Sequence, residues 1–295
     1  MFAPPVIQEL AGGRLHLSHG PIDVVLKAWG PAGEVRAAYA AAARRFSTIL
    51  PELADELAEL RTPMHEAPNV AGPVARRMLA ACRPFADTYV TPMAAVAGAV
   101  ADELLAEMTA AARLTRAFVN DGGDIAVLAT PGHPLDIGIA ADFSAGKVPA
   151  LNGRVRLDAA SGVGGVATSG ARGRSFSLGI ADSVTVLARD AAGADAAATL
   201  VANAVDVDSP AVQRRPAREL DPDSDLRELP VTVSVGALSA REIDLALAHG
   251  LERAAQFRRR GLLVDAALVL AGEARTLSLQ PPALPQGGVP SLHLN

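Results

Sequence analysis

Two oxygen-bearing side chains, Asp195 and Thr199, stand four residues apart in an alanine-rich stretch, which places both on one face of a helix. A carboxylate and a hydroxyl are hard donors of the kind that Mg²⁺ accepts, with water or phosphate oxygens completing its shell. The pair is therefore a candidate Mg²⁺ site. Because Asp195 follows Gly193, it also suits a helix cap or a first-turn residue, and both interpretations stay open.

A second group with chemical potential is the segment from Asn120 to Asp124, in which two carboxylates flank the pair Gly122-Gly123. Glycines at the end of a strand permit positive φ or the close approach of a ligand. An ordinary hairpin turn needs the same residues, so composition does not decide between a turn and a binding loop.

A third group lies in the Gly/Ser-rich residues 161–173, where hydroxyls and glycines are concentrated. Thr168 and Ser169 offer hydroxyls, and glycines such as Gly170 let backbone N–H groups approach a phosphate. Arg172 and Arg174 are suited to neutralising pyrophosphate charge. The alternative is an ordinary flexible surface loop.

The loose dinucleotide pattern G-x-G-x-x-A also occurs here, over residues 162–167. Its chemistry requires a helix N-terminus directed at the pyrophosphate. Residues 168–173 have no helical period, so we do not expect a Rossmann site. Residues 221–225 alternate Asp with other residues but lack the Gly and Glu of an EF-hand, which favours a solvated or capping loop.

The elements that must position these groups follow from hydrophobic periodicity, with Pro51 expected to separate two helices or to open the second. We expect helices over residues 34–60, 74–85, 91–112, 191–205 and 239–258, and strands over residues 15–26, 118–120, 125–128, 176–180, 184–187, 231–235, 262–270 and 274–279. Residues 176–187 suggest a hairpin, and residues 209–230 suggest a long polar loop. The order of helices and hairpins predicts an α+β fold, with one domain over residues 1–279 and a flexible Pro/Gly-rich tail over residues 280–295.

Composition limits the class of protein. Half of the residues are hydrophobic and the net charge is -5, which favours a sizeable core and argues against a nucleic-acid surface. There is no apolar run of about 18 residues and no signal-like start, so we expect a cytoplasmic protein outside the membrane. The single cysteine, Cys82, is expected to be buried.

The motifs, taken in order, resemble the ApbE-like family of FAD:protein FMN transferases. The resemblance is carried by Asn120-Asp121-Gly122-Gly123-Asp124, Ala167-Thr168-Ser169-Gly170, Val184-Thr185-Val186, and Ala194-Asp195 with Thr199. The chain resembles a shorter branch of this superfamily more closely. Marks of that branch are residues 19–23, 91–98, 174–182 and 220–225.

The resemblance implies an ApbE-like, T-fold-related arrangement of antiparallel sheets packed with helices. It implies FAD or FMN as the nucleotide, a small-molecule partner, and Mg²⁺ held by Asp195 and Thr199 on the diphosphate. The candidate cofactor-binding residues are Asn120, Gly122, Gly123, Asp124, Thr168, Ser169, Gly170, Arg172, Arg174, Thr91 and Met93. It implies phosphoryl-transfer chemistry, in which positioning and charge neutralisation dominate catalysis.

The chain departs from the transferases in one segment. They carry His-Ile-x-Asp-Pro before the Val-Thr-Val strand, whereas this chain has Gly179-Ile180-Ala181-Asp182-Ser183. No catalytic residue is therefore assigned, and three activities stay open: FMN transfer, cleavage of the FAD pyrophosphate, and ligand binding without catalysis. A pterin or C1-carrier enzyme is a further alternative, on fold-level analogy. An oligomer is compatible with all of these.

Overall fold

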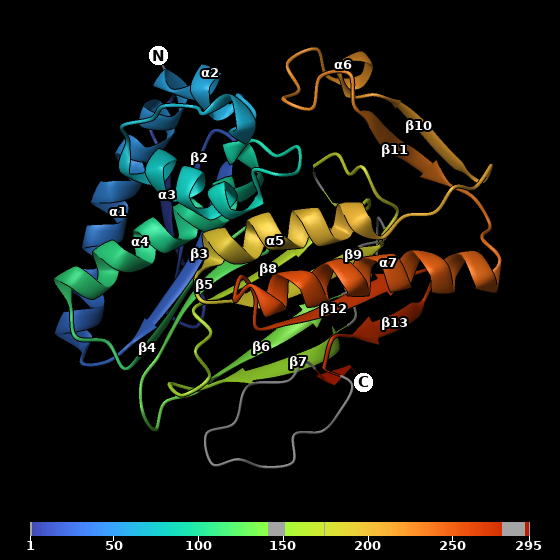
Figure 1. The fold of residues 1–295 in the computed structure, drawn as a ribbon. Coiled ribbons are helices and arrows are strands. Elements are labelled where there is room, and N and C mark those ends of the chain that lie inside the picture. The colour runs from blue at the N-terminus through green and yellow to red at the C-terminus, as the bar shows by residue number, and fades with distance from the viewer. Residues whose placement is uncertain (1, 141–150, 174, 279–292, 295) are drawn as a thin grey trace. The chain divides into compact units, whose positions relative to one another are not determined.

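The computed structural model describes residues 2–140, 151–173, 175–278 and 293–294, in which helices and strands are mixed along the chain (Figure 1). The strand pairs with a defined register are antiparallel. This confirms the predicted α+β class. The chain forms two compact units. The first comprises Met1–Leu135, Leu157–Ala167 and Ala188–Ala196, and the second comprises Asp136–Arg156, Thr168–Leu187 and Ala197–Asn295.

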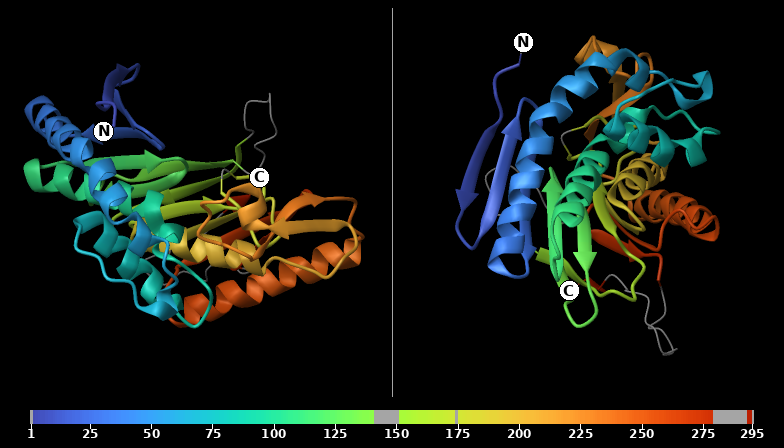
Figure 2. Two further views of the ribbon diagram at one scale, coloured as in Figure 1. Left: turned by 90° about the horizontal axis from the view of Figure 1, so that it is seen from above. Right: turned by 90° about the vertical axis from the view of Figure 1, so that its left-hand side faces the viewer.

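The first unit is built on adjacent strands in the order β1 (Val6–Leu10), β2 (Arg14–His19), β3 (Ile22–Trp29), β4 (Arg116–Asp121), β5 (Asp124–Ala129) and β8 (Gly165–Ser169). Its main helices are α1 (Ala32–Asp55), α2 (Leu57–Leu60), α3 (Pro73–Cys82) and α4 (Val96–Ala111). Alternate residues of β2 and β3 are fully or nearly fully buried, as expected for strands with one face on a core. Helices α1 and α4 lie on the same side of these strands (Figure 2).

Helix α1 corrects one prediction, because Pro51 lies inside it and neither ends it nor begins a new helix. A proline inside a helix removes one backbone hydrogen bond. Buried side chains on both sides of it, including Phe46, Leu50 and Leu53, hold the helix against the core. Packing therefore outweighs the local preference.

The second unit contains β9 (Ser183–Ala188), β12 (Asp265–Leu270) and β13 (Glu273–Thr276) in that order. It also contains the hairpin of β10 (Val212–Pro216) and β11 (Pro230–Val235), and the strands β6 (Leu135–Ala140), β7 (Leu151–Leu157) and β14 (His293–Leu294). Its helices are α6 (Ala217–Leu220) and α7 (Ala240–Arg259). The predicted helix from residue 239 is confirmed, with Ser239 and Glu242 forming a capping box.

Two predictions in the second unit are wrong. Residues 176–180 form no strand, so residues 176–187 form no hairpin, and β9 pairs with β12. The side chain of Asn203 accepts the N–H of Leu178 at 3.0 Å, which supplies the bond a hairpin partner would have made. The expected polar loop over residues 209–230 contains β10 and α6. The predicted tail lies outside the described residues except for His293 and Leu294.

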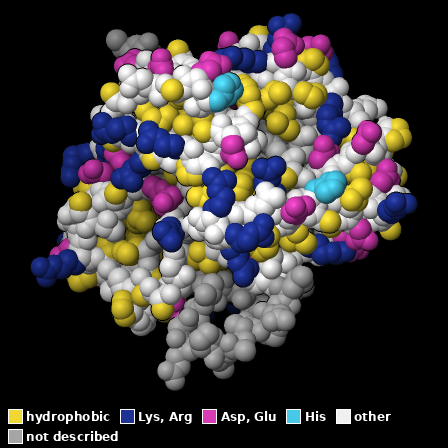
Figure 3. Space-filling view, viewed as in Figure 1, with side chains coloured by type: hydrophobic (Ala, Val, Ile, Leu, Met, Phe, Trp, Pro, Cys, Tyr) yellow, Lys and Arg dark blue, Asp and Glu magenta, His cyan; other side chains and the backbone are white. Residues whose placement is uncertain are grey.

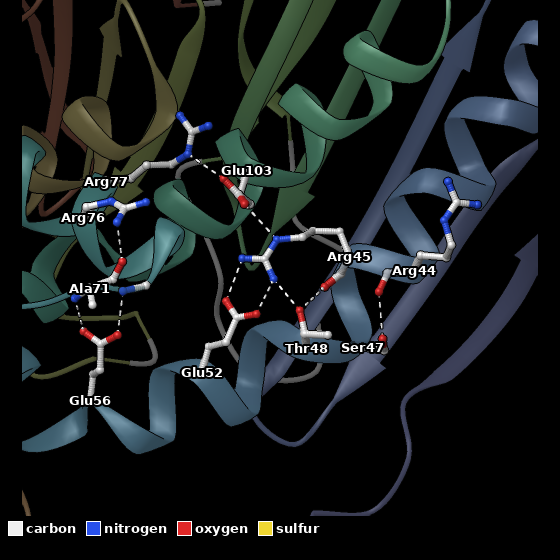
Figure 4. A network of polar contacts seen from close by, with 11 residues as sticks. Arg44, Arg45, Ser47, Thr48, Glu52, Glu56, Ala71, Arg76, Arg77 and Glu103 are labelled. Carbon is white, nitrogen blue, oxygen red and sulfur yellow. Dashed lines mark hydrogen bonds and ion pairs between the residues drawn. The ribbon is translucent and has the colours of Figure 1, made fainter.

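An ion-pair network around the buried Glu103 joins α1, α3 and α4 in the first unit (Figure 4). Glu103 bonds Arg45 and Arg77, each at 2.8 Å, and Arg45 also bonds Glu52 at 2.8 Å. Burial alone would raise the pKa of Glu103, but the hydrogen bonds from the two arginines outweigh it and lower that pKa. The network keeps a carboxylate charged inside the helical layer.

On the face shown in Figure 3, basic and acidic side chains are interspersed rather than segregated by sign. Within the described residues, no helix has the length and apolar character needed to cross a membrane.

Candidate functional site

The candidate site of the first unit is centred on the start of helix α5 (Ala191–Ala204). Asp190, immediately before the helix, accepts the N–H of Gly193 at 2.7 Å. Asp102, from the middle of α4, accepts the N–H of Ala191 at 3.0 Å and that of Ala192 at 2.9 Å. Three N–H groups that a helix start leaves without an intrahelical partner are thus bound by carboxylates.

The start of helix α4 is in turn capped by a carboxylate from α5. Its own N-cap residue, Ala95, provides no side-chain hydrogen bond. Instead, the Asp195 carboxylate of α5 accepts the N–H of Gly98 at 3.1 Å. Asp195 is therefore a capping residue, but it caps a helix distant in sequence. We call the bonds made by Asp102 and Asp195 the reciprocal cap.

Three glycines let these backbones come together. A Cβ at Gly98 would lie 2.2 Å from the Ala191 carbonyl oxygen, and one at Gly165 would lie 2.2 Å from the Ala191 nitrogen. A Cβ at Gly164 would lie 2.2 Å from the Arg189 carbonyl oxygen. The glycine-rich residues 162–167 therefore pack against the entry to α5. They lead into strand β8 and not into a helix, which agrees with the expectation that this segment is no Rossmann site.

The turn between β4 and β5 carries the second predicted group. Gly122 and Gly123 have φ of 64° and 117°, so this two-residue hairpin requires residues that tolerate positive φ. Asn120 accepts the N–H of Gly123 at 2.9 Å and holds the turn closed. These residues therefore form a hairpin turn, and the turn sets the positions of the flanking carboxylates Asp121 and Asp124.

The structure brings these carboxylates into electrostatic contact with Asp195. Burial raises the pKa of Asp195 well above its ordinary value, and the charges of Asp124 and Asp121 raise it further. The backbone N–H groups of Gly98 and Ala97 act in the opposite direction. A cation bound to Asp195 would offset the cost of holding this negative charge.

The carboxylate of Asp102 has a similar character. Burial raises its pKa to about 6, the N–H groups of Ala192 and Ala191 oppose this shift, and the charge of Asp190 adds to it. Asp102 therefore changes charge in a mildly acidic range, although its two hydrogen bonds favour the ionised form.

The fit to Mg²⁺ follows from this donor set. Among the described residues, no group of three His, Cys, Asp or Glu side chains is arranged to hold a metal. Mg²⁺ does not require such a cage, because it is usually bound through one or two carboxylates and keeps waters or phosphate oxygens. Asp195, with Thr199 four residues further along the same helix, fits that mode.

The second unit holds the predicted hydroxyl and arginine residues. Thr168 and Thr185 share a hydroxyl hydrogen bond of 2.9 Å. Arg172 forms an ion pair of 2.7 Å with Asp182, although its side chain remains 54% exposed. A Cβ at Gly170 would lie 2.6 Å from the Asp182 carbonyl oxygen. Ser169 is half-buried at the end of β8, and Arg174 lies outside the described residues.

The remaining two candidates precede α4. Thr91 is buried at the start of the 3₁₀ turn Pro92–Ala95, where it makes no side-chain capping bond, and Met93 is half-buried in that turn. Cys82 is buried, as predicted, with its sulfur 3.4 Å from the Thr91 carbonyl oxygen.

Sequence reasoning missed Asp102 and Gly98. A signal for Asp102 was present, because Asp102 and Glu103 are the only charged residues between Asp87 and Glu107. Charges in an otherwise apolar helix need partners when buried. Nothing in the sequence shows that the partner of Asp102 is the start of α5.

These features define an α+β protein whose first unit brings the Asp195 carboxylate into the field of Asp121 and Asp124. The family model described as AbpE bacteria matches residues 7–276, and the chain belongs to that family. The predicted resemblance is thereby confirmed at the level of the family.

Several UPF0280 proteins are similar in sequence to this chain. Those of Methanothrix thermoacetophila, Methanopyrus kandleri and Methanosarcina acetivorans are 40%, 39% and 33% identical over 52%, 48% and 55% of this chain. These matches span 62%, 54% and 60% of the relatives, less than two thirds of their length.

Two solved structures also show similarity over 94% of the chain. One is the ApbE protein from Thermotoga maritima, with 14% identity, a TM-score of 0.42 and 97% of its chain covered. The other is the apo form of the flavinyl transferase ApbE from Pseudomonas stutzeri, with 12% identity, a TM-score of 0.40 and 96% of its chain covered.

Proposed function

We propose that this protein binds a flavin nucleotide, FAD or FMN, together with Mg²⁺, and that it cleaves or transfers a flavin phosphate. The observation that carries the proposal is the Asp195 carboxylate, held at the start of α5 beside the charges of Asp121 and Asp124. Membership of the AbpE bacteria family supports flavin as the nucleotide.

Asp195 and Thr199 are the proposed Mg²⁺ ligands. Mg²⁺ held by these residues would supply charge neutralisation at the phosphate oxygens. Thr168, Ser169 and Arg172 remain proposed nucleotide contacts, with Arg172 already oriented by Asp182.

The proposed reaction breaks the phosphoanhydride bond of FAD. An acceptor oxygen, from water or from a hydroxyl compound, forms a bond to the phosphorus of the FMN half, loses its proton to solvent, and AMP leaves. The segment that aligns with the transferase His-Ile-x-Asp-Pro motif has no histidine here, and its Asp182 is engaged by Arg172 and by the Ala271 N–H at 2.6 Å. This departure favours a small acceptor, or binding alone, over a protein acceptor.

The test compares FAD binding, with and without Mg²⁺, in the wild type and in two Asp→Asn variants. Asp195→Asn keeps an oxygen that can accept the Gly98 N–H but removes the charge that a metal requires. We expect it to lose the Mg²⁺-dependent part of FAD affinity, at least tenfold. Asp190→Asn is the matched control, because it lies on the same helix start and Asn caps a helix as well as Asp does.

Absence of FAD binding by the wild type at high micromolar ligand, with Mg²⁺ present, would sink the flavin proposal. Equal Mg²⁺ dependence in wild type and Asp195→Asn would leave Asp195 as a cap only. Release of AMP and FMN, followed by chromatography, separates an enzyme from a binding protein.

A further inference from the structure

Asp102 is a half-buried titratable group that has no role in the proposed function. It lies one turn after Gly98 on α4, and its two oxygens bind the N–H groups of Ala191 and Ala192, at 3.0 and 2.9 Å. A bidentate carboxylate on two successive N–H groups fixes both the position and the direction of a helix start. Asp195 projects from that same helix start, one turn further along.

The orientation of Asp195 depends on the spacing between the two helices. Its Oδ2 accepts the Gly98 N–H at 3.1 Å, and the Ala97 N–H also favours its ionised form. Gly98 touches the Ala191 backbone so closely that no Cβ fits between them. Any movement of the α5 start relative to α4 therefore turns the Asp195 carboxylate away from its present direction.

We infer that Asp102 is a positioning residue for the metal. It acts through the reciprocal cap, by holding the α5 start where the Asp195 carboxylate both caps α4 and binds the cation. The inference rests on the proposed function, because it requires Asp195 to be a metal ligand. Partners that orient a metal ligand typically change metal affinity 10- to 100-fold when mutated.

Asp102→Asn is the direct test. Asparagine offers one acceptor oxygen and an NH₂ group, so it cannot accept both N–H groups of α5. Asp102→Glu keeps two acceptor oxygens and the charge but lengthens the side chain by one methylene. It provides a second variant in which the helix start is displaced without loss of a partner.

The matched control is Glu56→Gln. Glu56 accepts the N–H of Ala71 at 2.8 Å and that of Gly72 at 2.7 Å, just before α3 (Figure 4). It makes the same kind of bidentate bond in the same unit but at a different helix. Its variant reports the general effect of losing such a bond on stability.

The measurement is the Kd for Mn²⁺, followed by electron paramagnetic resonance of the free ion, in the full-length protein with saturating FAD. Thermal unfolding midpoints are recorded for each variant. We expect Asp102→Asn to weaken Mn²⁺ binding tenfold or more, and Asp102→Glu to weaken it by a smaller factor. Glu56→Gln is expected to lower the unfolding midpoint comparably without changing the Kd.

An unchanged Mn²⁺ Kd in folded Asp102→Asn overturns the positioning role while leaving the proposed function intact. Equal weakening in Glu56→Gln, or failure of both Asp102 variants to fold while Glu56→Gln folds, also overturns it in favour of a purely structural role. If the wild type itself binds no Mn²⁺, the metal assignment and this inference both fail.

Discussion

At the scale of single residues, the two acids of the reciprocal cap show how one side chain serves two purposes. Asp195 is both a tertiary helix cap and the proposed metal ligand, so the two interpretations of its sequence position are compatible. Asp102 supplies the opposite half of the contact, and burial raises the pKa of both carboxylates. In the reciprocal cap, both carboxylates accept hydrogen bonds from neutral backbone N–H groups.

The raised pKa of Asp102 predicts a pH dependence of stability. Its folded-state value of about 6 exceeds the unfolded value of about 3.9, so folding favours the protonated form. The stability it contributes is fully present below about pH 4 and is lost as pH rises through about 6. Asp102→Asn has no carboxyl at this position, so its stability does not change with pH in this way. The free energy of unfolding of the variant minus that of the wild type should therefore increase from pH 4.5 to 6.5, by at most ~3 kcal/mol. Urea unfolding across that range measures it, and a difference that does not change with pH contradicts it.

At the scale of elements, the contact between β8 and the entry to α5 determines where the candidate metal ligand lies. Gly165 approaches the backbone of Asp190 and Ala191, where no side chain can move aside to make room for a Cβ. The helix start is thus fixed by contacts with both β8 and α4.

Gly165→Ala should therefore destabilise the protein by ~1–3 kcal/mol, as overpacking does, and should also weaken Mg²⁺ binding. Chemical denaturation and metal titration measure the two effects. Gly33→Ala is the control, because Gly33 lies near the start of α1 with only the Arg36 side chain near a new Cβ, at 4.0 Å. This control should be neutral or stabilising by up to ~1 kcal/mol. Equal destabilisation by the two substitutions would contradict the prediction that the close contact of Gly165 with the α5 entry requires a glycine.

At the scale of the whole molecule, binding of a ligand to the folded protein must raise its free energy of unfolding. If folded protein binds FAD with Mg²⁺ and unfolded protein does not, free ligand at 100 times its Kd raises the free energy of unfolding by ~2.7 kcal/mol. Thermal unfolding with FAD and Mg²⁺ together should show an increase larger than with either alone. Asp195→Asn should remove the extra increase due to Mg²⁺. Identical midpoints in the presence and absence of both ligands would contradict the proposed function for the whole chain.

Much of the fold was predictable, because it depends on local periodicity and turn chemistry. The helix starting after Ser239, the strands flanking Gly122 and Gly123, and the alanine-rich helix α5 all follow from patterns within about fifteen residues. The exceptions depend on distant partners. Pro51 stays helical because the core holds α1, and β9 pairs with β12, about eighty residues later in the chain.

The sequence by itself determined the α+β class, the family, and the residue types available for a metal and a phosphate, since these depend on composition, spacing and ordered motifs. Only the tertiary structure decided that Asp195 caps α4, that Asp102 caps α5, and that Asp121 and Asp124 share the field of Asp195. The physical reason is that free N–H groups at a helix start donate to any carboxylate brought within reach. Which carboxylate arrives depends on contacts across some ninety residues of chain, which no local pattern encodes.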